Sequence, residues 1–190
     1  MENKRFDPQK LALLNNPVRL KDFPPEFIVK QTAIKTPSVI IDLGAGTGFF
    51  SIPFAEMYKK CKIYACDISD IMIDWMKENR SGYNNIIPMK IEDSSIPLDN
   101  DIADFLFMVN LHHELDNPEE TLKECHRLLK SDGKIAISDW KKVKTEYGPP
   151  IELRYDPNDV KEQLLATGFK KVNINTAFPN NFLIIAEKQN

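Results

Sequence analysis

A strand-like apolar segment followed by closely spaced glycines is the first stretch of this chain whose residue types suit ligand binding. The run Val39–Asp42 ends on an acid, and glycine then occupies alternate positions at Gly44, Gly46 and Gly48. A strand that enters a glycine-rich turn and then a helix brings backbone N–H groups and a helix N-terminus against a ligand. The pattern therefore predicts a loop that binds a nucleotide or nucleoside, although glycines also serve simple turns.

The spacing of the glycines distinguishes between the known nucleotide-binding loops. A dinucleotide loop of the form G-x-G-x-x-G needs its third glycine at position 49, where this chain has Phe49, and the Gly-Lys-Ser/Thr of a P-loop is missing. What remains is D-x-G-x-G-x-G, from Asp42 to Gly48, in which glycine lets the chain turn tightly beside an adenosine with a short tail. This arrangement favours a nucleoside ligand without a pyrophosphate.

A second acid, Asp67, ends the next strand-like run, about twenty residues beyond the loop. From the end of that strand, a carboxylate can accept hydrogen bonds from both hydroxyls of a ribose, and it would repel a 2′-phosphate. The alternative is that Asp67 caps the following turn together with Ser69.

These residues need a scaffold, and the alternation of short apolar runs with helical segments predicts a parallel sheet covered on both faces. The last two strand candidates are separated by a turn around Pro179, so we expect them to form an antiparallel hairpin at one edge. The candidates are Val39–Asp42, Lys62–Cys66, Ile86–Met89, Phe105–Asn110, Lys134–Ser138, Val172–Asn175 and Phe182–Ala186.

Prolines and capping residues mark the helices between these strands. Asn117 followed by Pro118 predicts a helix that runs to about Lys130, with Gly133 beyond its end. Pro53 lies soon after the glycine loop and lacks a helical donor, so the helix there is expected to begin late or to bend.

The first 38 residues have a different character from the rest of the chain. Asp7-Pro8 and Pro24-Pro25 each begin a short helical stretch, and no segment there has the pattern of a strand. We expect residues 1–38 to form a helical lid over the carboxyl edge of the sheet, or else a simple N-terminal brace. The chain of 190 residues is predicted to form a single structural domain.

The combination of Asp42, the glycines, Asp67 and a seven-strand pattern resembles the class I S-adenosylmethionine-dependent methyltransferases. The resemblance runs from about Val39 to the C-terminus and includes "KIEDSSIPLDNDIADFLFMVN" and "ECHRLLKSDGKIAISDW". It implies a small methyltransferase-domain protein with a Rossmann-like, doubly wound α/β fold, whose cofactor-binding domain is residues 39–190. The sheet would be mostly parallel, with an antiparallel C-terminal edge hairpin and the N-terminal helical lid.

The resemblance also implies where the cofactor, S-adenosyl-L-methionine, would bind. The glycine loop would face the methionine tail, the end of the second strand the ribose, either of two acids the adenine amino group, and the end of the fourth strand the sulfonium. The residues at these positions are Asp42, Gly44, Ala45, Gly46, Asp67, Ile68, Glu92, Asp93, Asn110 and Leu111.

Methyl transfer from a sulfonium needs positioning of the acceptor and, for some acceptors, removal of a proton. His112 and His113 follow the fourth strand at the edge where ligands of such sheets bind, and they are the candidate catalytic residues. Alternatively, one of them caps the turn before Asn117. No metal is expected, because "HHELDN" lacks the second histidine of a zincin motif and the three cysteines are scattered.

Charge and composition narrow the choice of partner. The formal net charge of -3 offers no positive field for nucleic acid, and no apolar stretch approaches the roughly 20 residues of a membrane helix. We therefore expect a cytoplasmic enzyme that acts on a small-molecule acceptor, without nucleic acid and without membrane insertion. Aminopropyl transfer and a non-catalytic, cofactor-binding module remain as alternatives.

Overall fold

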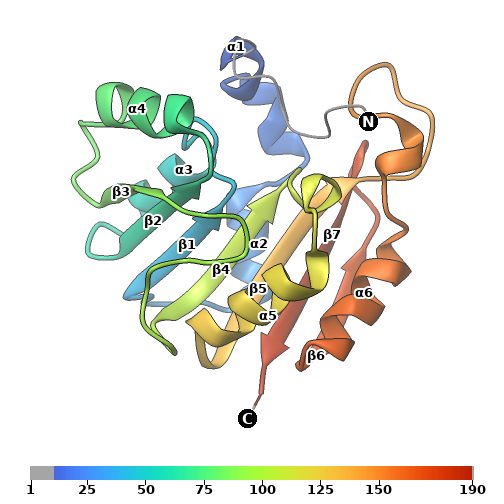
Figure 1. Ribbon diagram of the computed structural model, residues 1–190. Coiled ribbons are helices and arrows are strands. Elements are labelled where there is room, and N and C mark those ends of the chain that lie inside the picture. Colours follow the sequence, from blue (N-terminus) through green and yellow to red (C-terminus); the bar gives the residue numbers. More distant parts are fainter. Residues whose placement is uncertain (1–10, 190) are drawn as a thin grey trace.

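The fold is built on one open sheet of seven strands, described here for residues 11–189 of a computed structural model. The strands lie in the order β3-β2-β1-β4-β5-β7-β6 (Figure 1). All neighbours from β3 to β5 are parallel, whereas β7 is antiparallel to both β5 and β6. The predicted doubly wound sheet with an antiparallel C-terminal edge is therefore confirmed. Its strands are β1 Val39–Leu43, β2 Lys62–Asp67, β3 Ile86–Lys90, β4 Ala103–Val109, β5 Leu129–Trp140, β6 Phe169–Asn175 and β7 Asn181–Lys188.

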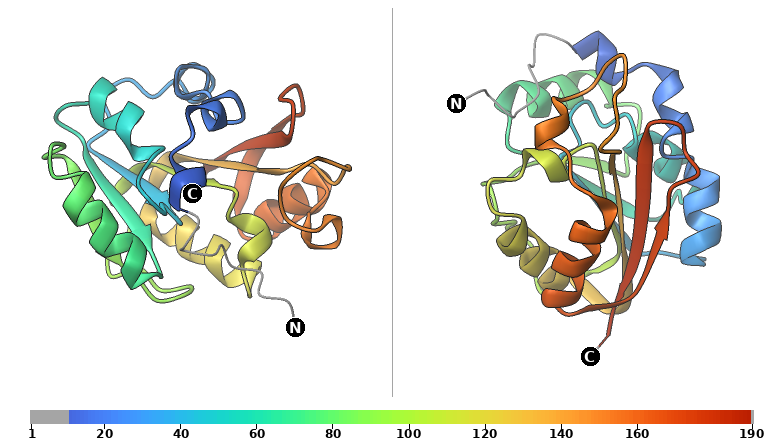
Figure 2. Two further views of the ribbon diagram at one scale, coloured as in Figure 1. Left: turned by 90° about the horizontal axis from the view of Figure 1, so that it is seen from above. Right: turned by 90° about the vertical axis from the view of Figure 1, so that its right-hand side faces the viewer.

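Helices cover both faces of the sheet, as the right-hand view of Figure 2 shows for α6 and α2. One face packs against α5 (Pro118–Leu128) and α6 (Pro157–Ala166), which contribute buried residues such as Leu122 and Val160. The other packs against α2 (Pro25–Thr32), α3 (Ser51–Met57) and α4 (Asp70–Asn79), with Phe54 and Met76 in its core. Burial of central strands on both faces explains why β1 consists of buried residues throughout.

The start of α5 follows the predicted capping pattern. The Asn117 side chain accepts a hydrogen bond from the N–H of Glu120, and Pro118 occupies the first turn, where its missing donor costs little. Pro53 is likewise tolerated, because α3 begins only at Ser51 and places the proline in its first turn. The expected late start of this helix is confirmed.

The end of α5 lies two residues before the predicted one. The helix stops at Leu128 rather than near Lys130, and β5 begins at once with Leu129, which pairs with Ala103 of β4. Gly133 lies inside β5, where an added Cβ would stand 2.8 Å from the Lys130 carbonyl oxygen. The glycine therefore serves an irregularity of the strand pair and does not end the helix.

Several other strand limits differ from the predicted ones. β4 begins two residues earlier than expected and ends at Val109, so Asn110 lies in the loop that follows. β6 begins at Phe169, directly after the glycine that follows α6. In both cases the additional residues gain ladder hydrogen bonds that periodicity alone does not indicate.

The N-terminal segment divides into two parts. α1 (Leu11–Leu14) and the 3-10 helix η2 (Pro17–Lys21) lie at the carboxyl edge of the sheet (Figure 1). Phe23 and α2 instead pack on one face, where Phe23 lies 5.4 Å from the Phe107 ring. The helix expected at Asp7-Pro8 lies outside the described residues. Across residues 11–189, every helix is too short or too polar to cross a membrane.

Candidate active site

The site lies where the strand order reverses, between β1 and β4. The chain proceeds from β1 outward to β3 on one side and from β4 outward on the other, so the loops after β1 and β4 diverge at this point. They nevertheless touch, because an added Cβ at Gly44 would stand 2.7 Å from the Leu111 side chain. Open α/β sheets bind their ligands in the crevice at such a switch point.

The glycine loop has a backbone that only glycine adopts readily. Gly44, Gly46 and Gly48 have φ values of 70°, 56° and 66°, all in the left-handed region. The N–H groups of Gly44 and Ala45 both donate to the Cys66 carbonyl oxygen at 2.9 Å, so β2 holds the loop in place. These two donors are thereby occupied, and the predicted contact of this backbone with the ligand would involve its remaining atoms.

Asp67 joins the end of β2 to the same loop. Its Oδ2 accepts a 2.7 Å hydrogen bond from the Gly46 N–H, and its Oδ1 accepts one of 2.8 Å from the Ser69 N–H. Burial raises the pKa of this carboxyl, and these backbone donors oppose the rise. The turn-capping contact considered as an alternative is thus made, yet a carboxylate has about four lone-pair sites and can accept further hydrogen bonds.

Asp42 is buried behind the loop, and its Oδ2 accepts a 2.7 Å hydrogen bond from the Ser51 hydroxyl at the start of α3. Burial raises its pKa to about 7, and the negative charge of Asp67 adds to the rise, whereas the Ser51 hydroxyl opposes it. A carboxyl with such a pKa changes its charge when a cation binds beside it.

The N-terminal segment lies directly on the glycine loop. An added Cβ at Gly46 would stand 3.3 Å from the Leu14 side chain. Arg80, which follows α4, donates to the Thr47 carbonyl oxygen at 3.0 Å and to the Asn15 side chain at 2.7 Å, so it links the loop to the segment above it. The Thr47 hydroxyl is buried and has no hydrogen-bond partner among residues 11–189.

The predicted adenine-side residues follow β3. Glu92 and Asp93 are exposed, and the N–H of Ile91 beside them donates to the Asp67 carbonyl oxygen at 3.1 Å. Ile68 is half-buried and packs against the core. The structure therefore brings these residues to the same edge as the glycine loop, with Asp67 between them.

Asn110 occupies the turn after β4 with a φ of 56°, a conformation that asparagine tolerates better than most residues. Its Oδ1 accepts a 2.5 Å hydrogen bond from the Asn181 side chain, and its N–H donates to the Ser138 carbonyl oxygen at 2.8 Å. The first residue of β7 thus fixes the turn that the family resemblance predicts to lie near the sulfonium.

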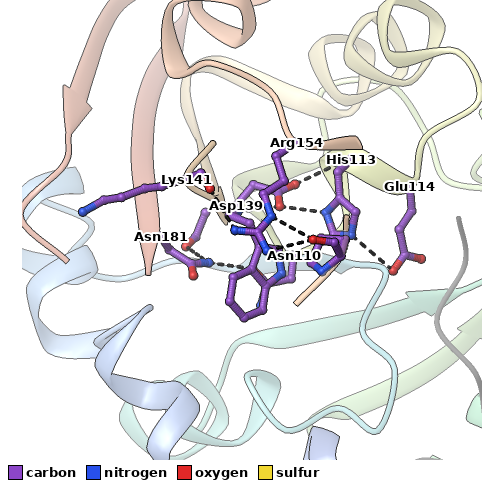
Figure 3. A network of polar contacts seen from close by, with 10 residues as sticks. Asn110, His113, Glu114, Asp139, Lys141, Arg154 and Asn181 are labelled. Carbon is purple, nitrogen blue, oxygen red and sulfur yellow. Dashed lines mark hydrogen bonds and ion pairs between the residues drawn. The ribbon is translucent and has the colours of Figure 1, made fainter. Parts of the chain in front are cut away.

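His113 forms a tight pair with Asp139 (Figure 3). Its Nδ1 lies 2.7 Å from Asp139 Oδ1, and its backbone N–H donates to Oδ2 at 2.9 Å. Its Nε2 lies 3.7 Å from the Glu114 carboxylate. Burial alone would lower the pKa of His113, but the Asp139 hydrogen bond and the charges of Asp139 and Glu114 outweigh burial and raise it. His113 therefore favours the cationic form.

His112 lies in a different environment, although it belongs to the same 3-10 helix, His112–Glu114. Its Nε2 lies 2.8 Å from the Gln163 side chain, and its ring packs edge-on against Tyr155. Burial lowers its pKa despite the opposing effects of Asp139 and Gln163. The buried Nδ1 has no hydrogen-bond partner in the described part of the chain. The surroundings of His112 therefore favour its neutral form, in contrast to those of His113.

The loop between β5 and α6 is held by Arg154, shown beside Asp139 in Figure 3. Its guanidinium donates to the Lys141 and Val143 carbonyl oxygens at 3.1 and 2.8 Å, and to the Pro149 carbonyl oxygen at 2.9 and 2.8 Å. A cavity of about 470 Å³ lies inside this loop, lined by residues 143–151 and Arg154. The cation thus shapes a long proline-containing segment beside the histidines.

Sequence reasoning identified the acids and histidines but missed the partners that orient them. Asn181 and Gln163 come from β7 and α6, far along the chain from Asn110 and His112, and no motif marks either residue. Asp139 gave a weak signal, since it directly follows the fifth predicted strand, Lys134–Ser138, at the ligand edge. Only the fold brings it against His113.

The strand order defines a Rossmann-like fold, and the switch point between β1 and β4 is the place where such folds bind ligands. A family model described as a methyltransferase domain matches residues 41–137. A crystal structure of an S-adenosylmethionine-dependent methyltransferase from Aquifex aeolicus has 34% sequence identity and a TM-score of 0.89, and the match covers 96% of this chain and 99% of that one. This chain belongs to the class I S-adenosylmethionine-dependent methyltransferases.

Two curated relatives show the range of acceptors within the similarity. A demethylmenaquinone methyltransferase from Chlamydia muridarum is 32% identical over 58% of this chain and 47% of its own length. A tRNA(Phe) (4-demethylwyosine(37)-C(7)) aminocarboxypropyltransferase from Methanocaldococcus jannaschii is 29% identical over 60% of this chain and 45% of its own. The chain spans about half the length of the curated relatives it matches.

The residues present fit S-adenosylmethionine, the methyl donor of this family. Positive-φ glycines keep side chains out of the loop, and a Cβ at Gly44 would collide with Leu111. Asp67 lies at the distance along the chain expected for a ribose acceptor, and its carboxylate is already aimed at the loop. The buried, unpaired Thr47 hydroxyl adds a polar group without a partner in residues 11–189.

Proposed function

We propose that this protein transfers the methyl group of S-adenosylmethionine to a small, partly apolar acceptor in the cytoplasm. The observation that carries the proposal is the hydrogen bond between Asp67 and Gly46, which joins the end of β2 to the glycine loop at the switch point, where a nucleoside would bind. The free cysteines Cys61, Cys66 and Cys125 are in keeping with a reducing compartment.

A small acceptor is favoured by charge and by the loop beside the site. The net charge of -3 provides little attraction for a polynucleotide. Val143, Tyr147 and Ile151 of the β5–α6 loop are exposed apolar or aromatic residues, and the loop follows β5 at the ligand edge. We propose that this loop contacts the acceptor.

The proposed cofactor contacts follow from the placement of each residue. Asp67 would accept hydrogen bonds from the ribose, with Ile68 against the adenine ring and Glu92 or Asp93 toward the adenine amino group. The backbone at Gly44, Ala45 and Gly46 would face the methionine tail, with Asp42 behind it. Asn110 and Leu111 would lie by the sulfonium. The bound cofactor supplies the activated methyl group, and the protein positions the acceptor in line with it.

The two histidines would have different roles in this proposal. Burial lowers the pKa of His112, which favours the neutral ring, and its Nδ1 is unpaired among the described residues, so it is the candidate base for an acceptor that must lose a proton. His113 has both ring nitrogens beside carboxylates, Nδ1 at 2.7 Å from Asp139 and Nε2 at 3.7 Å from Glu114, and these contacts raise its pKa and hold the ring in place. His113 is therefore proposed to position the loop after β4.

Methyl transfer can be distinguished from a second reaction, the transfer of an aminocarboxypropyl or aminopropyl group, because the two leave different nucleoside products. One relative is named as an aminocarboxypropyltransferase. Methyl transfer converts the donor to S-adenosylhomocysteine. Transfer of the aminocarboxypropyl group, or of an aminopropyl group from the decarboxylated donor, leaves 5′-methylthioadenosine instead. A binding module that holds the cofactor without turnover would give neither product.

The test identifies the nucleoside product and the labelled acceptor. The protein is incubated with S-adenosylmethionine labelled in its methyl group, together with a small-molecule extract or with total RNA, and the products are identified by mass spectrometry. We expect S-adenosylhomocysteine and label in the small-molecule fraction. Gly46→Val is the matched inactive control, because valine at a φ of 56° beside Leu14 is strained and fills the loop. Methylthioadenosine, or label only in RNA, would overturn the proposal.

A further inference from the structure

His112 is held in place by one residue of α6 and by another that lies just before this helix. Its Nε2 is 2.8 Å from the side-chain oxygen Oε1 of Gln163, and its ring packs edge to face with that of Tyr155, with 5.0 Å between the ring centres. The imidazole is fully buried. A hydrogen bond at one nitrogen and an aromatic ring beside it fix both the position and the plane of His112.

The Gln163 contact determines which nitrogen of His112 carries the proton. An amide oxygen only accepts hydrogen bonds, so the Nε2 that faces Oε1 is the donor. Burial lowers the pKa of His112 and favours the neutral ring, which holds a single proton. With that proton on Nε2, the lone pair of the neutral ring lies on Nδ1.

The reverse orientation of the Gln163 amide fits these surroundings less well. It would turn the NH2 group toward Nε2 and require the proton of His112 to lie on Nδ1. That nitrogen is buried and has no hydrogen-bond partner within residues 11–189, so an N–H group there would lack an acceptor in this part of the chain. Buried donors without an acceptor are rare, because they lose their hydration without a replacement. The contacts therefore favour the proton on Nε2.

His113 shows the opposite arrangement, although it is the next residue. Its Nδ1 lies 2.7 Å from the Asp139 carboxylate, which accepts hydrogen bonds, so this nitrogen carries a proton. The two histidines are thus held through different nitrogens. The contact that orients His112 leaves the lone pair of its Nδ1 available, whereas the contact that orients His113 uses Nδ1.

We propose that Gln163 is a positioning residue, which holds His112 with its proton on Nε2 and its basic lone pair on Nδ1. The inference rests on the proposed function, in which His112 takes a proton from the acceptor. In that step the acceptor atom loses its proton to Nδ1 as it bonds to the methyl carbon, and the electron pair of the carbon–sulfur bond remains on sulfur. The resulting imidazolium keeps its Nε2–H bond to Gln163, so the bond persists through the transfer.

The place of Gln163 in the chain links the orientation of His112 to the loop that is proposed to contact the acceptor. Arg154 donates to carbonyl oxygens of this loop, Tyr155 follows directly, and α6 begins soon after. At the end of α6, the Gln163 carbonyl oxygen accepts hydrogen bonds from the N–H and the hydroxyl of Thr167 at 3.1 and 2.9 Å. One continuous segment therefore shapes the loop and orients the candidate base.

The first test measures the tautomer of His112 and does not require the acceptor. Long-range proton–nitrogen NMR spectra of the full chain with isotopically labelled histidine distinguish a protonated ring nitrogen from one with a lone pair. The chain has 3 histidines, and the signals of His112 are those missing from His112→Asn. At about pH 8, where an ordinary histidine is neutral, we expect the wild-type proton on Nε2.

Two replacements of Gln163 separate its hydrogen bond from its size. Gln163→Met keeps the length of the side chain but removes the acceptor, so the ratio of the Nε2–H to the Nδ1–H form should fall about 5- to 10-fold, as for the loss of one hydrogen bond. Gln163→Glu keeps an acceptor and adds a negative charge, so the Nε2–H form should persist and the midpoint of the His112 titration should rise. Both variants leave unchanged the other titratable side chains that act on or pack against His112, which are Asp139, His113 and Tyr155.

The matched control is Glu162→Met, which removes the polar end of an exposed neighbour on α6 and should leave the tautomer ratio of His112 unchanged. Circular dichroism confirms that each variant is folded. A wild-type proton on Nδ1, or equal tautomer ratios in the wild-type protein and Gln163→Met, would overturn the assignment of Gln163.

The second test asks whether this orientation acts on the reaction. With the acceptor fraction from the labelling assay, Gln163→Met should lower turnover about 2- to 10-fold, because part of the protein then holds the proton on the wrong nitrogen and the ring is less firmly fixed. Its affinity for S-adenosylhomocysteine should change less than about 2-fold. In Gln163→Glu, the pH below which turnover falls should rise together with the NMR midpoint, which a purely structural role would not produce.

The outcomes separate this inference from the proposed function. A changed tautomer ratio with unchanged turnover would overturn the role of Gln163 in the reaction and that of His112 as the base, while the cofactor assignment would stand. If the wild-type protein transfers no methyl group, the proposed function fails and the catalytic part of the inference fails with it. The NMR spectra would then still decide whether Gln163 orients His112.

Discussion

The Asp67 carboxylate and the backbone N–H of Gly46 are joined by a 2.7 Å hydrogen bond. The contact fastens the end of β2 to the loop that follows β1, and the other oxygen of Asp67 accepts the Ser69 N–H at the turn before α4. One carboxylate thus organises two neighbouring loops at the ligand edge. With the proposed ribose contact, Asp67 would combine a structural role and a ligand-binding role, so its replacement should affect both stability and affinity.

Asp67→Ala should weaken S-adenosylmethionine binding about 10- to 100-fold, because charge-assisted hydrogen bonds to the ribose contribute roughly 1.5–3 kcal/mol. It should also lower the melting temperature by several degrees, since the Gly46 and Ser69 N–H groups lose their acceptor. Titration calorimetry and thermal melts measure the two effects.

The control for this prediction is Asp70→Ala, which removes an exposed acid at the start of α4 and should change affinity little. A 2′-deoxyribose analogue of the cofactor should lose less affinity than the native cofactor in Asp67→Ala, because one of its two bonds is already absent. Equal losses for the two ligands would show that Asp67 acts only on the protein backbone.

The N-terminal segment should separate into a brace and a lid when its residues are replaced one at a time. Phe23→Ala should cost about 3–5 kcal/mol of unfolding free energy, because Phe23 is fully buried against Phe50, Phe54 and Phe107. Leu14→Ala should cost less than about 1 kcal/mol but should speed cofactor dissociation, because Leu14 covers Gly46. Denaturant titration measures the unfolding free energy of the two variants, and stopped-flow experiments measure their cofactor dissociation rates. If Phe23→Ala and Leu14→Ala changed the two quantities to the same extent, the N-terminal segment would not divide into a brace and a lid.

The sequence pattern could predict those parts of the site whose conformation depends on residues adjacent in the chain. The glycine loop needs positive φ at Gly44 and Gly46, and that requirement is visible in the sequence. Asp67 was predictable because it ends a strand at a spacing set by one strand-turn-helix-strand unit.

The remaining parts depend on contacts between distant segments. Gln163 meets His112 only because α6 packs on the sheet beside the loop that follows β4, and the sequence around Gln163 carries no signal of this. The start of β5 at Leu129 depends on pairing with Ala103, which overrides the helical pattern of the preceding residues. Local helix propensity does not contain the strand pairing that determines where α5 ends and β5 begins.

The His113–Asp139 pair should make stability depend on pH in a defined direction. The raised pKa of His113 means that the pair stabilises the folded state fully below the ordinary histidine pKa of about 6.5, and that this contribution is lost as pH rises through the folded value. Asp139→Asn should therefore lower the melting temperature more at pH 6 than at pH 9. The control Asp74→Asn removes an exposed acid and should show no such trend. An equal loss at both pH values would contradict a charged pair.

Asp42 should release a proton when the cofactor binds. Its pKa is raised from 3.8 to about 7, so the free protein holds this proton at pH 6. Because the folded state binds the proton more tightly than the unfolded state, the contribution of Asp42 to stability decreases as pH rises from 3.8 to 7. The ammonium group of the methionine tail would stabilise the ionised carboxylate and displace the proton, so affinity should increase from pH 5.5 to 7.

The proton can be counted by titrating S-adenosylmethionine at pH 6 in two buffers that differ in ionisation enthalpy. The α-amino group of the ligand ordinarily titrates at about 7.7–8.0, so it is protonated at pH 6 and contributes little. For the wild-type protein, we expect the difference between the binding enthalpies in the two buffers to correspond to the release of most of one proton. For Asp42→Asn we expect no such difference, and in this variant the Ser51 hydroxyl keeps an oxygen acceptor. Identical heats for the wild-type protein would mean that Asp42 keeps its charge state on binding, and that the tail's ammonium is held by other groups.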